Sequence, residues 1–192
     1  METEVVAKKE MQMKRMFLRG AVGAFLTLGA ASMASAQVLV QLPDSSQTTT
    51  LTANVSSQAT VTTPANVTFN VTNVAANTNA TAAALTVTNI VLPLATDQLK
   101  VSVKANAASF TPPVALATTW AAADVTWAAG TWTNATGSSG TLTDASFTTV
   151  ATCAADASGC NTTNLPFTLA ANASVRRSGN HTLVITWKFE QL

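Results

Sequence analysis

The end of the chain alternates between apolar and polar side chains, and it reads GNHTLVITWKFEQL over residues 179–192. Successive side chains of a strand point to opposite faces, so Leu183, Ile185, Trp187 and Phe189 share one face. This pattern predicts a C-terminal strand with one buried face, wedged between two facing layers. At about 1.5 to 3 kcal/mol per fully buried large side chain, we expect this strand to dominate the stability of the core.

Shorter alternating runs precede the tail and predict further strands, separated by Pro, Gly and polar turns. The expected strands are 37–42, 50–55, 66–72, 98–104, 147–151 and 166–170. Between residues 81 and 92 the apolar positions change parity near Asn89, which predicts a β-bulge there. The run 98–104 has the cleanest alternation, with Leu99, Val101 and Val103 facing inward.

The alanine-rich segment 117–127 is compatible with a helix by propensity, but Thr, Val and Trp interrupt it and no charge pairs support it. We therefore expect strand or loop. Gly130 predicts a hairpin between 124–127 and 131–133, and 137–140 predicts a second turn.

Eight to ten short strands with turns between them, and no convincing amphipathic helix, predict an all-β fold. The expected architecture is a single antiparallel β-sandwich of the immunoglobulin-like or Greek-key type. A single closed barrel is the alternative, and the uneven strand lengths disfavour it.

The first 36 residues have the features of a cleaved signal peptide. Basic residues precede an apolar run at 21–33, and Ala34-Ser35-Ala36 forms an A-x-A cleavage site. The run is shorter than the roughly 20 residues of a membrane span, so we expect no span in the mature chain. The predicted domains are a signal peptide at 1–36 and a β-sandwich at 37–192, in which 37–47 forms an N-terminal extension. The protein is expected in the periplasm, at the cell surface or outside the cell.

Charge is scarce in residues 37–192, which contain only five basic and six acidic residues. Phosphate binding needs clustered Lys and Arg, so nucleic acid and anionic membranes are not expected partners. A surface rich in the uncharged residues Thr, Asn and Ser produces little electrostatic repulsion between neighbouring copies of the protein. Self-association or contact with other surface proteins is therefore the expected mode of interaction.

The two cysteines, Cys153 and Cys160, lie in the sequence TCAADASGC. In an exported chain this spacing predicts a disulfide that closes a surface loop. A metal pair would need further soft ligands, and a redox pair has tighter spacing. Asp156, Ser158 and Asn161 weakly resemble a calcium loop but supply too few acidic ligands. We expect no metal and no cofactor.

Catalysis would have to use His181, the sole histidine. No nucleophile motif accompanies it, and the carboxylates are scattered singly along the sequence. The sequence therefore indicates a protein that is not an enzyme, with His181 in an exposed turn. Arg176 and Arg177 are expected in a solvated turn.

Trp120, Trp127 and Trp132 allow two interpretations. Exposed indole faces stack on sugar rings, so these residues could form the platform of a secreted carbohydrate-binding module. Their odd spacing places neighbours on opposite faces of an uninterrupted strand, which favours packing in the core. A glycan is thus the alternative partner.

The exported sandwich with an alternating last strand resembles the subunits of bacterial chaperone–usher fimbriae, including the spore-coat-U-like branch. By position, Gly179, Leu183, Ile185, Trp187 and Phe189 match the spacing of the final strand that a chaperone grips in that family. The resemblance implies that an N-terminal extension of one subunit completes the sheet of the next, with Val38, Val40 and Leu42 as the donor stretch. The chain differs from the family in Gln191 at the penultimate position and in its late cysteine pair.

These observations favour a structural or adhesive surface protein that associates through the edges of its sheets. The alternative function is a secreted carbohydrate-binding module that uses exposed tryptophans.

Overall fold

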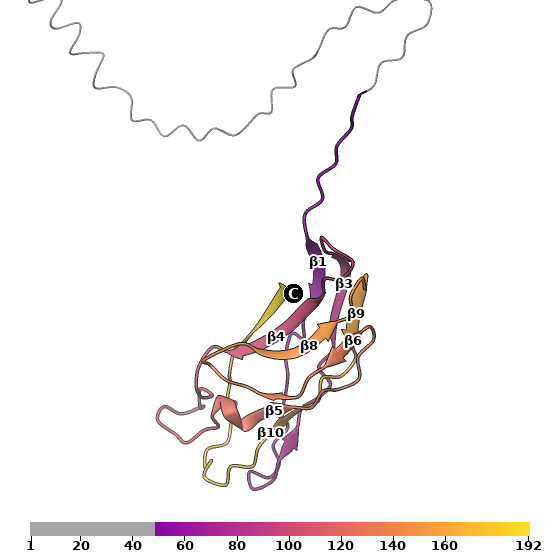
Figure 1. Cartoon of the computed structure of the whole chain (residues 1–192). Coiled ribbons are helices and arrows are strands. Elements are labelled where there is room, and N and C mark those ends of the chain that lie inside the picture. The colour runs from indigo at the N-terminus through magenta and orange to yellow at the C-terminus, as the bar shows by residue number, and fades with distance from the viewer. Residues whose placement is uncertain (1–48) are drawn as a thin grey trace, which may run out of the picture. The chain divides into compact units, whose positions relative to one another are not determined.

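The computed structural model describes residues 49–192, of which 52–192 form one compact unit. Within these residues the fold is all-β, with three antiparallel sheets and no α-helix, which confirms the predicted class. Figure 1 shows β1, β3 and β9 at the end where the chain terminates, and β5 and β10 at the other end. The expected signal peptide and the extension 37–47, with Val38, Val40 and Leu42, lie outside the described residues.

The three sheets contain strands from distant parts of the chain. The first has the order β1 (Gln58–Thr62), β3 (Leu85–Val91), β9 (Gly159–Thr162). The second has the order β2 (Thr78–Asn79), β10 (Phe167–Leu169), β5 (Val125–Trp127), β7 (Gly140–Thr141). The third has the order β11 (Ile185–Gln191), β4 (Leu99–Ala105), β8 (Thr148–Cys153), β6 (Ala135–Gly137).

Strand β4 lies at the centre of the third sheet and supplies much of the core. Its inward residues are those that the alternation predicts: Leu99, Val101 and Val103 are all buried, and so is Ala105. The strand pairs with β11 on one edge and with β8 on the other. Both pairings are antiparallel, so every apolar side chain on the inward face of β4 has close neighbours on both sides.

The predicted change of face in β3 is confirmed. Leu85 and Val87 are buried, whereas the following pair of residues is exposed. Asn89 adopts a left-handed conformation with φ of 52°, which Asn tolerates better than most residues. The register against β1 shifts at the same place, as a β-bulge requires.

The alanine-rich segment forms no α-helix, as expected. A single 3-10 turn, η1 (Ala122–Asp124), leads directly into β5. The predicted hairpin after β5 is wrong, however, because β5 pairs with β10 and β7. Thr133, in the expected second arm, instead forms an isolated bridge with Asn161. Gly130 does adopt a positive φ of 67°, but this local signal does not identify the partner strand.

The expected strand at 50–55 is also wrong. No residue in this range has strand structure, and the side chains of Leu51 and Val55 are 92% and 72% exposed. The alternation of Leu and Val with Thr and Asn is present in the sequence, but nothing in the unit 52–192 pairs with it.

The tail strand forms at 185–191, but its predicted place in the middle of the fold is wrong. Strand β11 is the outermost strand of its sheet and is hydrogen-bonded only to β4. Its inward side chains, Ile185, Trp187 and Phe189, are half-buried, whereas the fully buried core residues belong to other strands. Period-2 alternation identifies a buried face, but it does not say whether a second strand flanks the edge.

The segment 66–72 has the predicted pattern of burial without the predicted ladder. Val67, Phe69 and Val71 are half-buried, and the residues between them are exposed. The only bridge in this segment joins Phe69 to Ala80. The segment thus has the side-chain arrangement of a strand while most of its main chain lacks a strand partner among the described residues.

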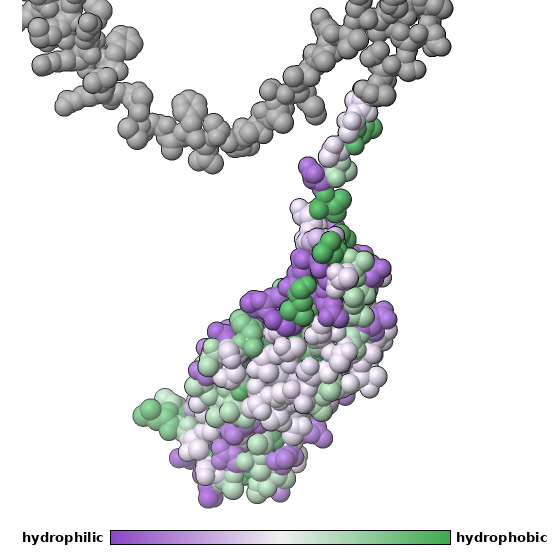
Figure 2. Space-filling model, viewed as in Figure 1, coloured by the Kyte–Doolittle hydropathy of each residue, from purple (hydrophilic) through white to green (hydrophobic). Residues whose placement is uncertain are grey.

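The surface agrees with the composition. Figure 2 shows a face covered mainly by residues of intermediate hydropathy, with scattered strongly apolar or strongly polar ones. No helix within residues 49–192 has the length and hydropathy needed to cross a membrane.

Candidate functional site

A long groove opens between the segment 63–72 and the segment 176–185, with a volume of about 1320 Å³. The groove reaches the main hydrophobic core. Both walls are chain segments with alternating burial. The groove therefore has room for one extended strand between its two walls.

The first wall is the tail of the chain. Leu183, Ile185 and Trp187 line the groove with half-buried side chains. Main-chain hydrogen bonds engage this segment on the side of β4 only, and they continue beyond the sheet from Asn106 N–H to the Val184 carbonyl at 2.9 Å. The other edge of β11 has no strand partner within residues 49–192, and such a free edge is the usual template for strand addition.

The second wall is formed by residues 63–72. Val67, Phe69 and Val71 point into the groove, and they pack against the core as partly buried side chains. Besides the bridge at Phe69, the Thr81 amide donates to the Thr68 carbonyl at 2.9 Å. These contacts tether the wall at its middle.

The floor of the groove consists of core side chains from the second sheet and its connections. Val125, Leu142, Phe167 and Leu169 are at most 4% exposed and line the groove from below. An apolar occupant would therefore contact a preformed apolar surface. Burial of apolar area, at about 25 cal/mol per Å², would be its main source of binding free energy.

One end of the groove is cationic. Arg176 and Arg177 line it and are exposed, as the predicted solvated turn requires. His181 lies beside them and is half-buried. Its Nδ1 is 2.7 Å from Thr119 Oγ1, and its Nε2 is 3.1 Å from the Arg177 carbonyl oxygen. His181 therefore fixes the loop at this end of the groove, and its two hydrogen-bond partners are a hydroxyl group and a main-chain carbonyl.

The turn into the tail depends on Gly179, which has a positive φ of 123°. A Cβ atom at this position would lie 2.9 Å from Pro113 Cβ. The glycine thus permits both the backbone conformation and the close approach of the loop that contains Pro113. It positions the start of the first wall.

The tryptophans do not form a sugar platform. Trp120 and Trp127 are only 5% and 3% exposed, and their Nε1 atoms donate to the Ala170 and Ser138 carbonyls at 2.9 Å. Trp132 is half-buried and donates to the Ala129 carbonyl at 3.0 Å. The first two indoles therefore belong to the core, as their odd spacing favours, and they are too buried for the alternative sugar platform.

The predicted disulfide between Cys153 and Cys160 is present. Both cysteines are fully buried and pack with Leu85 and Val87 in a second, smaller core cluster. The loop that they close is short and exposed. Within residues 49–192 no group of three or more His, Cys, Asp or Glu side chains lies close enough to hold a metal ion.

The structure thus brings together predicted residues of the tail, Gly179, Leu183, Ile185 and Trp187, at the groove, while Phe189 lies farther along β11 beside the smaller core cluster. Sequence reasoning missed the second wall as part of a site. The signal was present in the alternation at 66–72, because a strand pattern with no obvious partner is what an incomplete sheet requires.

No known protein family matches this chain, and neither a curated protein nor a solved structure is detectably similar to it.

Proposed function

We propose that this protein is an exported structural or adhesive subunit that associates by strand addition, and that its groove receives an extended segment from a second copy. The observation that carries the proposal is the pair of groove walls. Among residues 49–192, β11 has a strand neighbour on one edge only, and the segment 67–72, with a strand's alternating burial, has only the bridge at Phe69. One added strand would pair with the free edge of β11 and cover the half-buried side chains of the two walls. It would also close the sheets into a sandwich of the immunoglobulin-like type.

The N-terminal extension 37–47 of a neighbouring copy is the proposed occupant. Val38, Val40 and Leu42 occur at every second position, so a strand would present all three to the floor of the groove. Its eleven residues are about as many as the ten residues of the wall 63–72 that line the groove. The match supports an occupant of this length.

Charge supports an antiparallel orientation of this donor against β11. If the donor runs antiparallel, with Val40 opposite Ile185, Asp44 falls opposite His181 and beside Arg176 and Arg177. If it runs parallel with the same pair aligned, Asp44 falls opposite the apolar side chain of Phe189 and has no cationic neighbour on that face. Opposite charges attract and like charges repel across a strand pair, so the antiparallel arrangement is favoured.

The first test compares two neighbouring apolar residues of the donor that point to opposite faces. Val40→Asn would place an amide over the apolar floor, whereas Leu39→Asn would place it on the outer face. We expect the first variant and a deletion of 37–47 to elute as monomers in size-exclusion chromatography with light scattering, and Leu39→Asn to assemble like the original chain. Monomeric behaviour of the unmodified chain, or unchanged assembly of the deletion, would refute strand addition.

The second test addresses orientation separately. Asp44→Arg should weaken assembly, and mixing it with an Arg176→Asp/Arg177→Asp variant should restore mixed assemblies in which the reversed donor meets the reversed acceptor. If assembly persists in all these mixtures without any effect of charge, the antiparallel register is wrong while strand addition still stands.

A further inference from the structure

The three lysines of the described residues, Lys100, Lys104 and Lys188, lie together on the outer face of one sheet. Lys100 and Lys104 are both on β4, and Lys188 is on the adjacent strand β11 opposite Ser102, midway between them. Alternation directs all three away from the core. They come from positions as far as 88 residues apart, so no basic run in the sequence reveals the cluster.

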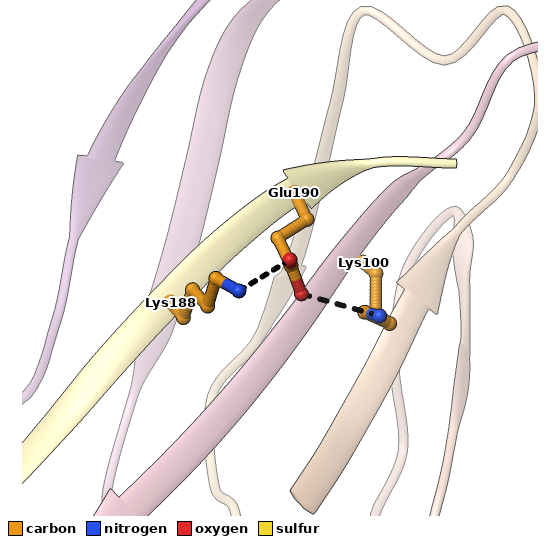
Figure 3. Close-up of polar contacts among 3 residues, drawn as sticks. All are labelled: Lys100, Lys188 and Glu190. Atoms are coloured by element: carbon orange, nitrogen blue, oxygen red, sulfur yellow. Dashed lines mark ion pairs between the residues drawn. The ribbon is translucent and has the colours of Figure 1, made fainter. Parts of the chain in front are cut away.

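A single carboxylate accompanies this lysine face, as Figure 3 shows. Glu190 lies between two of the lysines, with its Oε2 3.2 Å from Lys100 Nζ and its Oε1 in an ion pair with Lys188. Hydrogen bonds from Lys188 and Lys100 lower the pKa of the Glu190 carboxyl, so it is ionised at neutral pH. Three positive charges and one negative charge leave a local charge of +2, although the five basic and five acidic residues of the described chain balance in total.

Two of the ammonium groups also converge on one aromatic ring. Lys104 Nζ and Lys188 Nζ lie 5.5 and 5.4 Å from the centre of the Phe147 ring, which is partly exposed. Lys104 has no carboxylate within ion-pair distance among the described residues. The attraction of the ring for cations thus holds two like charges near one ring, and an anion that contacted both ammonium groups would offset their repulsion.

We propose that this lysine face binds an anionic polysaccharide, a linear sugar polymer that carries carboxylate or sulfate groups. The lysines lie on a flat sheet face among Thr149, Thr152 and Thr186, whose hydroxyl groups can hydrogen-bond to sugar hydroxyls. Lys100 and Lys104 are four residues apart, about 13 Å along the strand, which suits successive charges of an extended polymer. The ring of Phe147 is already engaged by ammonium groups and offers no free platform for a nucleobase, which disfavours nucleic acid.

Binding by one such face should be weak and sensitive to salt, because its charges are exposed and few. The lysine face is on the outer side of the sheet, whereas the groove is at the free edge of β11, so both can be occupied together. Where subunits assemble as proposed above, the face would repeat along the assembly and gain avidity toward a long polymer. The binding itself does not depend on assembly.

The test uses the full-length protein, with dextran sulfate and polygalacturonate as probes and neutral dextran and duplex DNA as controls, at low and at moderate salt. A charge-matched pair of variants separates the face from net charge: Lys104→Gln/Lys188→Gln and Arg176→Gln/Arg177→Gln each remove two positive charges. We expect the lysine pair to weaken binding of at least one anionic sugar polymer about tenfold and the arginine pair to change it less than about twofold, since only the lysines would contact the polymer. Glu190→Gln, which removes the competing carboxylate, should tighten binding about threefold.

Three results would overturn the proposal. The first is the absence of binding to both anionic polymers by the unmodified protein. The second is equal weakening by the lysine and arginine pairs, which would indicate an effect of net charge. The third is duplex DNA bound as tightly as the anionic sugar polymers, which would make the face a general polyanion site. Thermal melting of each variant checks that the exposed substitutions leave the fold intact.

Discussion

Thr111 and Thr182 exchange two main-chain hydrogen bonds, with N···O distances of 2.7 and 3.0 Å, at the base of the loop that precedes the tail strand. The pair fixes the point from which the first wall of the groove begins. Three residues earlier, Gly179 turns the chain in a conformation that L side chains rarely adopt. The bridge and the glycine together determine where the chain enters β11 and how the free edge of this strand is oriented.

Gly179→Ala should therefore destabilise the protein by about 1 to 3 kcal/mol, because the new Cβ meets both an unfavourable backbone conformation and Pro113. Urea denaturation followed by circular dichroism measures the effect. Ser178→Ala, an exposed neighbour, is the matched control and should change stability by less than about 0.5 kcal/mol. Equal stability of the two variants would contradict the assigned role of Gly179.

Removal of the disulfide by replacing Cys153 and Cys160 with Ser should lower stability by about 2.5 kcal/mol on the chain-entropy estimate for so short a loop. Buried hydroxyl groups would add to the loss, so Ala at both positions is the milder comparison. Unfolding of the original chain with and without a reducing agent gives an independent measure. A reduced protein as stable as the oxidised one would show that the crosslink has no such effect.

Trp127→Ala should cost about 3 to 5 kcal/mol, since the indole is buried and its N–H is hydrogen-bonded. Trp187→Ala should cost markedly less in the monomer, because this indole lines the open groove and is half-buried. The two variants are compared by urea denaturation at protein concentrations where the chain is monomeric. If both variants lost the same free energy of unfolding, the groove around Trp187 would be closed in solution.

The ion pairs of Glu190 predict a small pH dependence of stability. Lys188 and Lys100 lower the pKa of this carboxyl in the folded protein, so the pairs stabilise the fold at pH values above the usual carboxyl pKa of 4.5. The contribution is lost as the pH falls through the lowered folded-state pKa. The difference in melting temperature between the original chain and Glu190→Gln should therefore be largest near neutral pH and vanish in acid, and salt should reduce it. A difference that is independent of pH would exclude this cause.

Strands with two neighbours could be predicted well from the sequence, and the edges of the fold could not. Val101 and Val103 were identified as inward residues, and Asn89 as the site of a bulge, because pleated alternation records which face is buried. The same pattern correctly predicted that Trp187 faces inward, but Trp187 is half-buried and not fully buried as expected. Alternation describes one strand at a time, whereas the place of a strand in its sheet depends on residues far away in sequence.

The candidate site was predictable in part. The tail residues were recognised, but Val67 and Phe69 were expected to lie in an ordinary strand, and the lysine face was not foreseen at all. Lys100 and Lys188 become neighbours only through the register between β4 and β11. The sugar platform failed for a related reason, since the exposure of Trp120 is decided by which loops cover it.

The central position of β4 has a consequence for how the chain folds. Its partners come much later in the sequence, since Val101 pairs with Ala151, 50 residues on, and Val103 with Trp187, 84 residues on. Ordering the sheet requires the closure of both long loops, and chains dominated by such distant contacts fold slowly. Until both partners arrive, the side chains that β4 buries in the folded protein lie on a strand with two unpaired edges, so the interval before closure is when the newly made chain is most exposed to aggregation.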